Sequence, residues 1–353
     1  LAGGGTAGHI EPALAVARQW MKTNPSDKCI FLGTKSGLEN SLVPAAGFEL
    51  RLIPKVAISR TPSASWLRIP FDLISSVVSS IKVVKKADVL VGFGGYVSAP
   101  AYLAAALSRT PIVIHEANAK PGWANRLGAL FTSYLAVAHA VDRGKFSDAL
   151  LAGLPLRSDV ANAAVTSAVN WGKARVDAKV RLGFPADAPL VFIMGGSQGS
   201  VAINGVVLKS VSTFNHKGIS VLHSVGKLNA LPAADGGYKP VAYVDAMADA
   251  YLAADLIIAR SGAVTCSEFR ALGRYALFVP LPVGNGEQFV NAASLVADGR
   301  AEVIDQKEFT SEFIATHIDR LLESASQAPV DGDDQDLDAA QKIVALTEFA
   351  FKS

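Results

Sequence analysis

Cysteine, charge and long hydrophobic runs are all scarce in this chain, and each scarcity argues against a class of protein. Its 353 residues include two cysteines, Cys29 and Cys266, each in or beside an apolar run, so we expect buried, reduced thiols and no disulfide framework. No run of about 18 uncharged apolar residues occurs, which argues against a membrane-spanning helix. Since 50% of the residues are hydrophobic, each of the two domains that this length predicts has enough apolar residues for a core.

The net charge of +2 conceals an uneven distribution, because the basic excess lies in Arg51–Lys86, where Asp72 is the one acid. Basic residues interleaved with apolar and aromatic ones favour attachment to an anionic membrane surface, here through the Arg60–Lys86 region and an exposed Trp66–Phe71 loop. The alternative is an ordinary amphipathic helix whose core-facing side chains are Ile74, Val77, Val78 and Ile81. A nucleic-acid partner is not expected, because the patch is short and the overall charge is near neutral.

Short β-branched runs alternate with longer helical patterns along the whole chain. Near-continuous apolar strands between helices are typical of parallel sheets covered on both faces, so the pattern predicts a doubly wound α/β fold, repeated twice. The predicted strands are Cys29–Leu32, Val89–Val91, Ile112–His115, Tyr134–Val137, Leu190–Met194, Ser220–Ser224, Val241–Val244, Leu256–Ala259 and Ala276–Val279. The predicted helices are Pro12–Thr23, Phe71–Lys86, Ser98–Leu107, Trp123–Leu130, Val201–Thr213, Ala246–Ala253, Ala263–Leu272, Glu287–Asp298 and about Leu337–Phe351.

A Gly/Pro break at Gly153-Leu154-Pro155 predicts the domain boundary. We expect an N-terminal domain over residues 1–154, a C-terminal domain over residues 155–336, and a C-terminal helix over residues 337–353 that packs back on the N-terminal domain. The polar, acidic stretch Ser324–Asp336 is predicted to be a surface loop.

Two glycine-rich turns, far apart in the sequence, each open a predicted helix. The first is Gly3-Gly4-Gly5-Thr6-Ala7-Gly8-His9, whose preceding strand we expect to be cut short because the chain opens on Leu1. The second is Gly195-Gly196-Ser197-Gln198-Gly199, which follows an apolar strand. Such turns leave unpaired N–H groups at the positive end of the helix dipole, which favours a phosphate or an anionic transition state.

His9 lies at the mouth of the first turn, which matches neither common nucleotide motif. No Gly-Lys-Ser/Thr follows it, and no acidic residue ends the second strand, where Phe31-Leu32-Gly33-Thr34 stands. An imidazole at this position can take a proton near neutral pH, and the helix dipole lowers its pKa and so keeps it neutral. The sequence leaves a helix-capping histidine as an equal alternative.

Two further strands are followed by residues that can carry chemistry. One run is Gly92-Phe93-Gly94-Gly95-Tyr96-Val97-Ser98, and the other is His115-Glu116-Ala117-Asn118. The carboxyl ends of strands in an open α/β sheet line one crevice, so we expect His9, Tyr96, His115, Glu116 and Asn118 to converge. A buried structural role is the alternative for His115.

The segment Arg260–Glu268 combines a turn with the start of a helix. Ser261-Gly262 predicts a helix N-terminus, whose first-turn amides at Ala263–Thr265 can bind phosphate. Glu268 lies past the first turn, where its carboxylate can accept both hydroxyls of a ribose. Gln288 and Asn291, which open the following helix, carry amides suited to the hydroxyls of a sugar.

Neither a metal nor a cofactor is predicted. The six histidines are scattered, and the acidic residues Asp331–Asp336 lie in a loop without a preceding strand, as expected of a solvated loop. A leaving diphosphate then needs helix N-termini and an arginine, for which Arg157, beside the domain boundary, is the candidate.

Six of these segments, in order, resemble the signature of the MurG glycosyltransferases. They are Gly4–Ala17, Gly94–Ser98, His115–Asn118, Gly195–Gly199, Arg260–Thr265 and Gln288–Ala292. The resemblance implies a GT-B fold, in which two Rossmann-like domains face a deep cleft, with the acceptor in the N-terminal half and the UDP-sugar mostly in the C-terminal half. It also implies a peripheral protein on the cytoplasmic face of the bacterial cell membrane.

The activity implied by the resemblance is an inverting, metal-independent transfer for peptidoglycan synthesis. N-Acetylglucosamine would pass from UDP-N-acetylglucosamine to the muramyl 4-hydroxyl of lipid I, forming lipid II. A UDP-N-acetylglucosamine epimerase of the same two-domain fold is the alternative.

The resemblance also assigns roles to individual residues. His9 is the favoured base and Glu116 the competing one. Thr6, Ala7, Gly8 and Asn118 would contact the sugar or the reacting centre, Arg157 and Ser197 the diphosphate, and Val244 the uracil. The remaining predicted substrate contacts are Gly95, Tyr96, Gln198, Ala263, Val264, Thr265, Cys266, Ser267, Glu268, Gln288 and Asn291.

Three residues depart from the family pattern. Ala7 replaces a usual Gly and Glu11 a usual apolar residue, and both bear on the mobility of the acceptor loop. Ala117 replaces a usual Gln, which removes an amide from the acceptor side.

Overall fold

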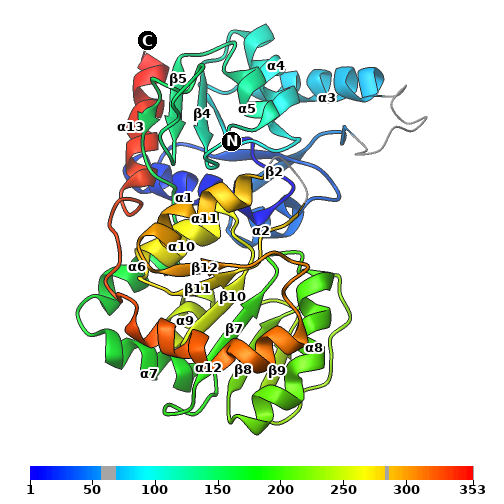
Figure 1. Ribbon diagram of the computed structural model, residues 1–353. Helices are drawn as coiled ribbons and strands as arrows, with labels where there is room; N and C mark the ends of the chain where they lie inside the picture. The colour runs from blue at the N-terminus through cyan, green and yellow to red at the C-terminus, as the bar shows by residue number, and fades with distance from the viewer. Residues whose placement is uncertain (57–68, 283–285, 353) are drawn as a thin grey trace. The chain divides into compact units, whose positions relative to one another are not determined.

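The computed structural model describes residues 1–56, 69–282 and 286–352, and it divides into two compact units (Figure 1). Unit 1 comprises Leu1–Arg157 together with Gln335–Ser353, and unit 2 comprises Ser158–Asp334. The division after Arg157 lies just beyond the Gly/Pro break in the sequence. Two crossings of the chain, at Arg157 and Asp334, join the units.

Parallel strands form the centre of unit 1. β1 (Ile30–Gly33) pairs with β2 (Glu49–Leu52), and a second sheet has the order β3 (Leu90–Gly92), β4 (Ile112–Glu116), β5 (Tyr134–Val137) and β6 (Leu150–Leu151). Ala2 forms parallel bridges with both Leu32 of β1 and Gly92 of β3, so it links the two sheets. Their carboxyl ends therefore lie on the same side.

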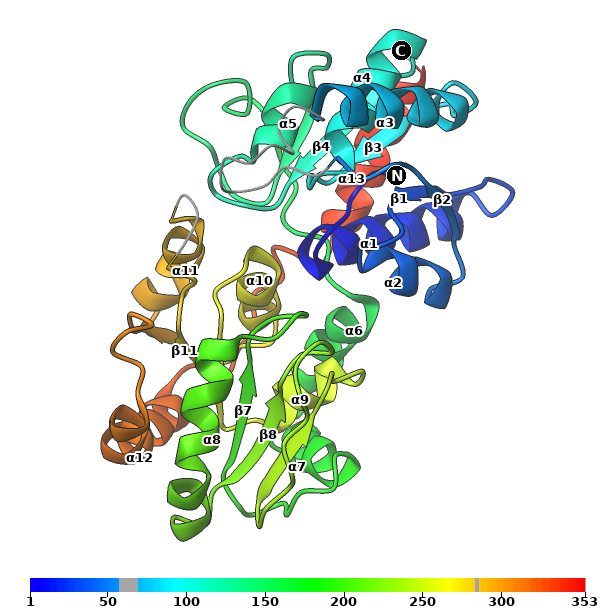
Figure 2. The ribbon, with the colours of Figure 1, turned by 90° about the vertical axis from the view of Figure 1, so that its right-hand side faces the viewer.

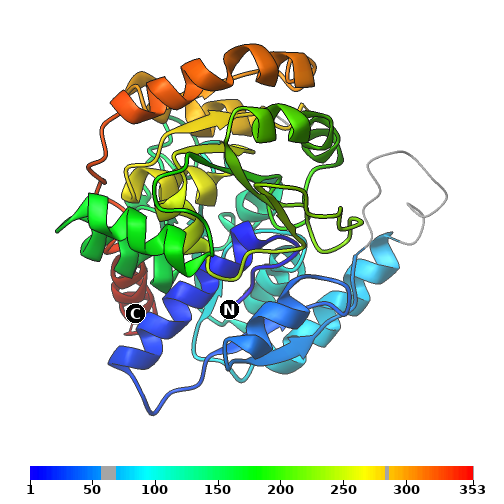
Figure 3. The ribbon, with the colours of Figure 1, turned by 90° about the horizontal axis from the view of Figure 1, so that it is seen from below.

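In the described part of unit 1, helices cover these two sheets. They are α1 (Ala7–Thr23), α2 (Glu39–Ala45), α3 (Ile69–Val84), α4 (Ser98–Ser108), α5 (Trp123–Gly128) and α13 (Ala339–Lys352). The red helix α13 packs against α1 and contacts β4 and β5 (Figures 1 and 3). α3 packs against α4 (Figure 2). One apolar core includes Ile10, Leu14 and Ile343, and another includes Tyr102 and Ile114.

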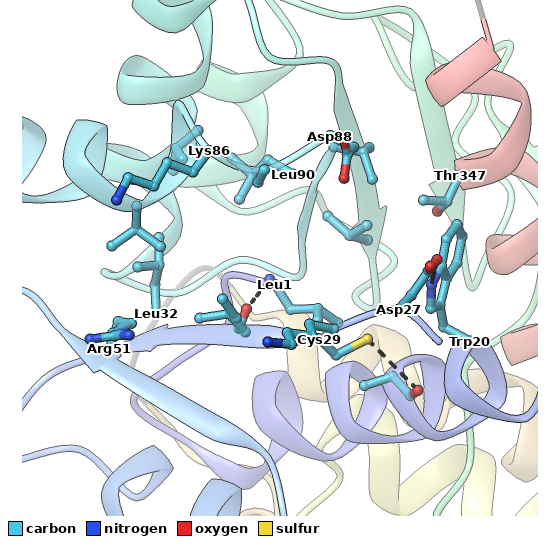
Figure 4. Close-up of a pocket in the computed structure, with 18 of the residues that line it drawn as sticks. Leu1, Trp20, Asp27, Cys29, Leu32, Arg51, Lys86, Asp88, Leu90 and Thr347 are labelled. Carbon is cyan, nitrogen blue, oxygen red and sulfur yellow. Dashed lines mark hydrogen bonds between the residues drawn. The ribbon is translucent and has the colours of Figure 1, made fainter. Parts of the chain in front are cut away.

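A cavity of about 640 Å³ lies in unit 1 between β1 and β3 (Figure 4). Leu1 borders it, and its main-chain nitrogen donates to the Ile30 carbonyl over 2.7 Å. None of the residues that line the cavity is a predicted site residue, so the cavity is distinct from the candidate site.

Unit 2 is built on a six-stranded parallel sheet with the order β12-β11-β10-β7-β8-β9. The strands are β7 (Leu190–Met194), β8 (Ser220–Ser224), β9 (Tyr238–Val241), β10 (Leu256–Ala259), β11 (Ala276–Phe278) and β12 (Ala301–Val303). The helices are α6 (Ser158–Ser167), α7 (Trp171–Arg181), α8 (Val201–His216), α9 (Met247–Ala253), α10 (Ala263–Ala271), α11 (Glu287–Ala297) and α12 (Ser311–Gln327). Buried side chains of α8 and α12, such as Val207 and Ile318, pack on one face of the sheet in a single core with Ile193 and Ile258.

The predicted strands are confirmed with one exception. The strand expected at Val241–Val244 is wrong, because β9 ends at Val241. β9 lies at the edge of the sheet and contains Lys239 and Pro240, so its composition does not indicate a strand. The apolar Val244, which suggested one, is buried in the loop that follows. The surface loop expected from Ser324 is also partly wrong, because α12 continues to Gln327 and buries Ala325.

Candidate functional site

The first glycine turn leads directly into α1. Gly5 has φ +94°, a conformation that favours glycine, and Thr6 is the extended N-cap residue. The Thr6 hydroxyl lies 3.2 Å from Nδ1 of His9, so it orients the imidazole. The N–H of Gly5 donates to Glu39 over 3.0 Å. This turn therefore differs from the predicted phosphate cradle, since a carboxylate already occupies one of its amides.

Two glycines allow the turn after β3 to approach His9. Gly94 and Gly95 have φ +89° and +80°. A Cβ atom on Gly95 would lie 3.2 Å from Nδ1 of His9, and one on Gly94 would lie 3.4 Å from its Nε2. Burial lowers the pKa of His9 below its ordinary value of 6.5, while the carboxylates of Glu116 and Glu39 act in the opposite direction. The imidazole is therefore neutral near pH 7, as a base must be.

Glu116 is buried, and both of its carboxylate oxygens accept hydrogen bonds. Oε1 accepts from the N–H of Asn118 at 2.9 Å and from its amide Nδ2 at 3.0 Å. Oε2 accepts from the N–H of Gly122 at 2.8 Å and from Nδ2 of Asn125 at 3.0 Å. Four donors thus hold the carboxylate, and this geometry is typical of a group that orders a loop.

Tyr96 and His115, two further residues expected at this site, have different surroundings. Tyr96 points toward Thr34 and Glu39, whose side chains lie 3.0 and 3.1 Å from its hydroxyl. His115 is buried with Nε2 2.8 Å from the Gly153 carbonyl, and burial lowers its pKa to about 4. The structure thus favours the structural alternative for His115. Its hydrogen bond holds the segment before the boundary.

Arg157 lies beside Glu11, with Nη1 3.8 Å from the carboxylate oxygen Oε1. Both side chains are largely buried, with exposed fractions of 16% and 11%. Glu11 is one of the residues that depart from the family pattern, so the departure places a carboxylate next to the predicted diphosphate arginine.

The loops of unit 2 meet where the strand order reverses. From β7 the chain continues to β8 and β9 on one side and then returns to β10 on the other. The turn Gly195–Gly199 follows β7 and opens α8, while Arg260–Gly262 follows β10 and opens α10. Loops on the two sides of such a switch point form the usual ligand crevice of an open α/β sheet. The second predicted phosphate turn therefore has the expected placement.

Arg260 joins these loops through its guanidinium group. Nη1 donates to the carbonyls of Val279 and Pro280 over 2.7 and 2.9 Å, and Nη2 donates to the Ser200 hydroxyl over 2.8 Å. Ser200 is the N-cap of α8, and its hydroxyl also accepts from the N–H of Ile203. Arg260 thus fixes the helix start at the second glycine turn.

α10 begins at Ala263, as predicted, after the N-cap Gly262. Its first-turn amides have no intrahelical acceptor, and Gly262 has no side chain to cap them. Val264 and Thr265 are half-exposed, whereas Cys266 and Ser267 are buried, and burial raises the pKa of the Cys266 thiol to about 12. Only the first turn of the helix thus reaches the surface of unit 2.

The predicted ribose and sugar contacts lie beside this helix. Glu268 is buried, and its Oε2 accepts from the Tyr251 hydroxyl over 2.8 Å. The Asn291 amide is buried and donates to the Ser261 carbonyl over 3.3 Å, while Gln288 Oε1 accepts from the N–H of Leu281 over 2.9 Å. Each group therefore has a partner of its own in unit 2.

Several residues of the site escaped sequence reasoning. Glu39, Asn125 and Tyr251 were not singled out, and Arg260 was noted as part of a motif without a role. Asn125 Nδ2 donates to Glu116 and its Oδ1 accepts from the Tyr102 hydroxyl over 2.7 Å. No spacing rule links these residues to their partners. The contacts of Glu39 with Tyr96 and of Tyr251 with Glu268 join different strand–helix units, and that of Asn125 with Glu116 depends on the conformation of the loop after β4.

Among the residues that the structure describes, no cluster of three or more His, Cys, Asp and Glu side chains is suited to a metal ion. Within the same residues, every helix is too short or too polar to span a bilayer.

Two family models match most of the chain. The Glycosyltransferase family 28 N-terminal domain matches residues 1–136, and the Glycosyltransferase family 28 C-terminal domain matches residues 190–345. A relative from Thermobifida fusca (strain YX) is 42% identical over 364 residues, covering 98% of this chain and 93% of that protein. One from Paenarthrobacter aurescens (strain TC1) is 42% identical over 335 residues, covering 93% and 88%. Both are named UDP-N-acetylglucosamine--N-acetylmuramyl-(pentapeptide) pyrophosphoryl-undecaprenol N-acetylglucosamine transferase.

Solved structures agree with these matches. MurG of Acinetobacter baumannii is 27% identical, with a TM-score of 0.67 over 99% of this chain and 98% of that one. The calicheamicin glycosyltransferase CalG4 is 13% identical, with a TM-score of 0.58 over 98% of this chain and 92% of that one, and it supports the fold alone. The chain therefore belongs to glycosyltransferase family 28 and, within it, to the MurG family of N-acetylglucosaminyltransferases.

Proposed function

We propose that this protein transfers N-acetylglucosamine from UDP-N-acetylglucosamine to the muramyl 4-hydroxyl of lipid I, forming lipid II for peptidoglycan. The names of the relatives, at 42% identity over almost the whole chain, carry this proposal. The geometry is compatible with it, because unit 2 offers helix N-termini for a diphosphate and unit 1 offers a neutral imidazole.

In the proposed reaction His9 acts as the base. The acceptor oxygen attacks the anomeric carbon from the face opposite UDP, and its proton passes to the imidazole of His9. The bond from the anomeric carbon to the diphosphate oxygen breaks, and UDP leaves with the electron pair, so the anomeric configuration inverts. Backbone N–H groups at the starts of α8 and α10, together with Arg157 and Ser197, would stabilise the departing negative charge without a divalent metal.

The other proposed substrate contacts are assigned according to the loop on which each residue lies. Thr6, Ala7, Gly8, Gly95, Tyr96 and Asn118 would contact the acceptor or the reacting centre. Val244 would hold the uracil, Glu268 the ribose, and Gln288 and Asn291 the donor sugar. Since four donors already hold Glu116, we assign it the ordering of the acceptor loop rather than the base.

A single incubation tests the reaction. We expect UDP to be released from UDP-N-acetylglucosamine when a lipid I analogue is present. The release should persist with EDTA, because helix dipoles and arginine, rather than a divalent cation, would stabilise the departing diphosphate. UDP release and product are measured by chromatography, and an incubation without acceptor is the control. Conversion of UDP-N-acetylglucosamine to its epimer without an acceptor would instead support the epimerase, which the names of the relatives do not favour.

We further propose that α3 attaches the protein to the anionic cytoplasmic face of the cell membrane. Its buried face carries Ser76 and Ser80, whereas Phe71, Ile74 and Val78 are exposed by 75, 61 and 50%. The expectation that Ile74 and Val78 face the core is therefore wrong, whereas Val77 and Ile81 pack against it as expected. The exposed stripe continues along the helix to Lys82, and the exposed Lys85 follows just after the helix ends, which suits anionic lipid. Arg60, Trp66, Leu67 and Arg68 lie outside the described residues.

Replacing Phe71, Ile74 and Val78 with serine is expected to weaken binding to vesicles of anionic phospholipid about tenfold or more, because apolar area is lost from the bilayer contact. Vesicle co-sedimentation measures it, and turnover of a soluble acceptor analogue should be unchanged. The matched control replaces Val165, Val169 and Val180, exposed by 60, 88 and 62% on unit 2, with serine. Equal binding by the α3 variant and the parent would refute the proposal.

A further inference from the structure

Glu39 is a carboxylic acid with 0% exposure that the proposed reaction leaves unused. Its Oε2 accepts from the N–H of Gly5 over 3.0 Å, in the turn that leads to His9. Its Oε1 accepts from the N–H of Thr34 over 2.9 Å, from the Thr34 hydroxyl over 3.2 Å and from the Tyr96 hydroxyl over 3.1 Å. One carboxylate thus binds the ends of three neighbouring strand segments.

Glycines make room for this side chain. A Cβ atom on Gly37 would lie 2.1 Å from both carboxylate oxygens of Glu39, and one on Gly33 would lie 2.4 Å from its Cγ. A Cβ atom on Gly4 would lie 3.3 Å from its Cδ. A larger residue at Gly33 or Gly37 would displace Glu39, so the local sequence is fitted to a carboxylate at this place.

The contacts of Glu39 converge on the residues around His9. The Gly5 turn determines where α1 begins, and Gly95, which precedes Tyr96, would clash with the Gly4 carbonyl at 2.3 Å if it carried a Cβ atom. The two glycine turns are therefore held in close contact, with His9 against the second turn. A buried acid is costly unless its oxygens are paired, so such a group is retained where it fixes a geometry.

We propose that Glu39 is a positioning residue for the transfer, which holds the Gly3–Thr6 turn and Tyr96 so that His9 faces the acceptor hydroxyl. This inference rests on the proposed function, and it deepens the account of its acceptor side. By occupying the Gly5 amide, Glu39 also makes the first turn poor for a diphosphate and suited to an uncharged hydroxyl. Apart from Arg157, the proposed contacts with the UDP part of the donor belong to unit 2, whereas the hydrogen-bond partners of Glu39 are residues of unit 1.

Glu39→Gln tests the proposal, because the glutamine keeps the shape but replaces one accepting oxygen with an NH₂ group. We expect kcat to fall about 10- to 100-fold, as the misplacement of a reacting group does, with the Kd for UDP unchanged within about twofold. Thr34→Val, which removes one hydroxyl from the same cluster, should give the same pattern with about a threefold to tenfold loss. The matched control is Glu49→Gln, an exposed acid on β2, with unchanged kcat.

A second readout does not depend on turnover. The imidazole signals of His9 in the NMR spectrum should shift in Glu39→Gln and Thr34→Val, and the pKa of His9 should fall in Glu39→Gln, because Glu39 and Glu116 are the two carboxylates that raise it. Unchanged kcat and His9 signals in both variants would overturn the role of Glu39, as would an equal loss of UDP affinity. An inactive parent with these NMR shifts present would refute the proposed function and leave Glu39 as the anchor of His9.

Discussion

Replacing His9 with asparagine is expected to lower kcat by about 100- to 10,000-fold, the usual contribution of a general base. Asparagine can still accept from Thr6, whose hydroxyl lies 3.2 Å from the imidazole, so the turn should keep its shape. The Kd for UDP should stay unchanged, because His9 is not among the expected UDP contacts, which are Arg157 and residues of unit 2. Steady-state turnover with a lipid I analogue and calorimetric titration with UDP measure the two quantities.

The pH dependence of the parent protein separates a base from a merely structural histidine. A base works in its neutral form, so kcat/KM should fall tenfold for each pH unit below the pKa of His9 and level off above it. Burial lowers that pKa, so the midpoint should lie below 6.5. This fall in kcat/KM at acid pH, the acid limb of the profile, should disappear in His9→Asn.

Glu116→Gln is the competing variant. If Glu116 only orders its loop, this variant should raise the KM for the acceptor and keep the acid limb, because four hydrogen bonds to the carboxylate are disturbed. Near-normal kcat in His9→Asn, with the limb lost in Glu116→Gln instead, would transfer the base role to Glu116.

Replacing Glu268 with alanine is expected to cost about 1–3 kcal/mol of UDP affinity, or roughly a 5- to 150-fold higher Kd. The proposed ribose would lose a charged acceptor, and the effect should be the same for UDP and for UDP-N-acetylglucosamine. Isothermal titration with both ligands measures it.

Tyr251→Phe is the matched control for this effect. It removes the 2.8 Å hydrogen bond from the Tyr251 hydroxyl to Glu268 and leaves the carboxylate in place. UDP affinity should change by less than about 1 kcal/mol. If Tyr251→Phe loses as much affinity as Glu268→Ala, Glu268 acts by holding its own helix, and the ribose contact must be sought elsewhere.

The sequence predicted the central elements of both sheets well and the edges poorly. Buried strands such as Leu190–Met194 and Leu256–Ala259 are nearly continuous apolar runs, because helices cover both of their faces. The edge strands β2 and β6 are mostly exposed, and so their residues carry little periodic signal. The start of α10 could be predicted because Ser261-Gly262 is a local signal.

Part of the candidate site could also be predicted from the sequence. The glycine turns, His9, Glu116 and the Arg260–Glu268 segment all follow predicted strands, so their placement at the carboxyl ends came from the βα alternation alone. The role of Glu39 did not, because its partner Tyr96 lies in another strand–helix unit. The role of Glu116 did not either, because its donors, although close in sequence, meet it only through the conformation of the loop between β4 and α5.

By itself, the amino-acid sequence determined which segments become strands and helices and which loops carry the chemistry, since apolar periodicity and glycine turns act over short distances. Tertiary structure alone decided which polar side chains are hydrogen-bonded to other groups of the protein. Glu39 joins three strand ends and His115 faces the Gly153 carbonyl, because these hydrogen bonds form between segments that only folding brings together. The four donors to Glu116 are close in sequence, but the conformation of the loop after β4 decides that they meet the carboxylate.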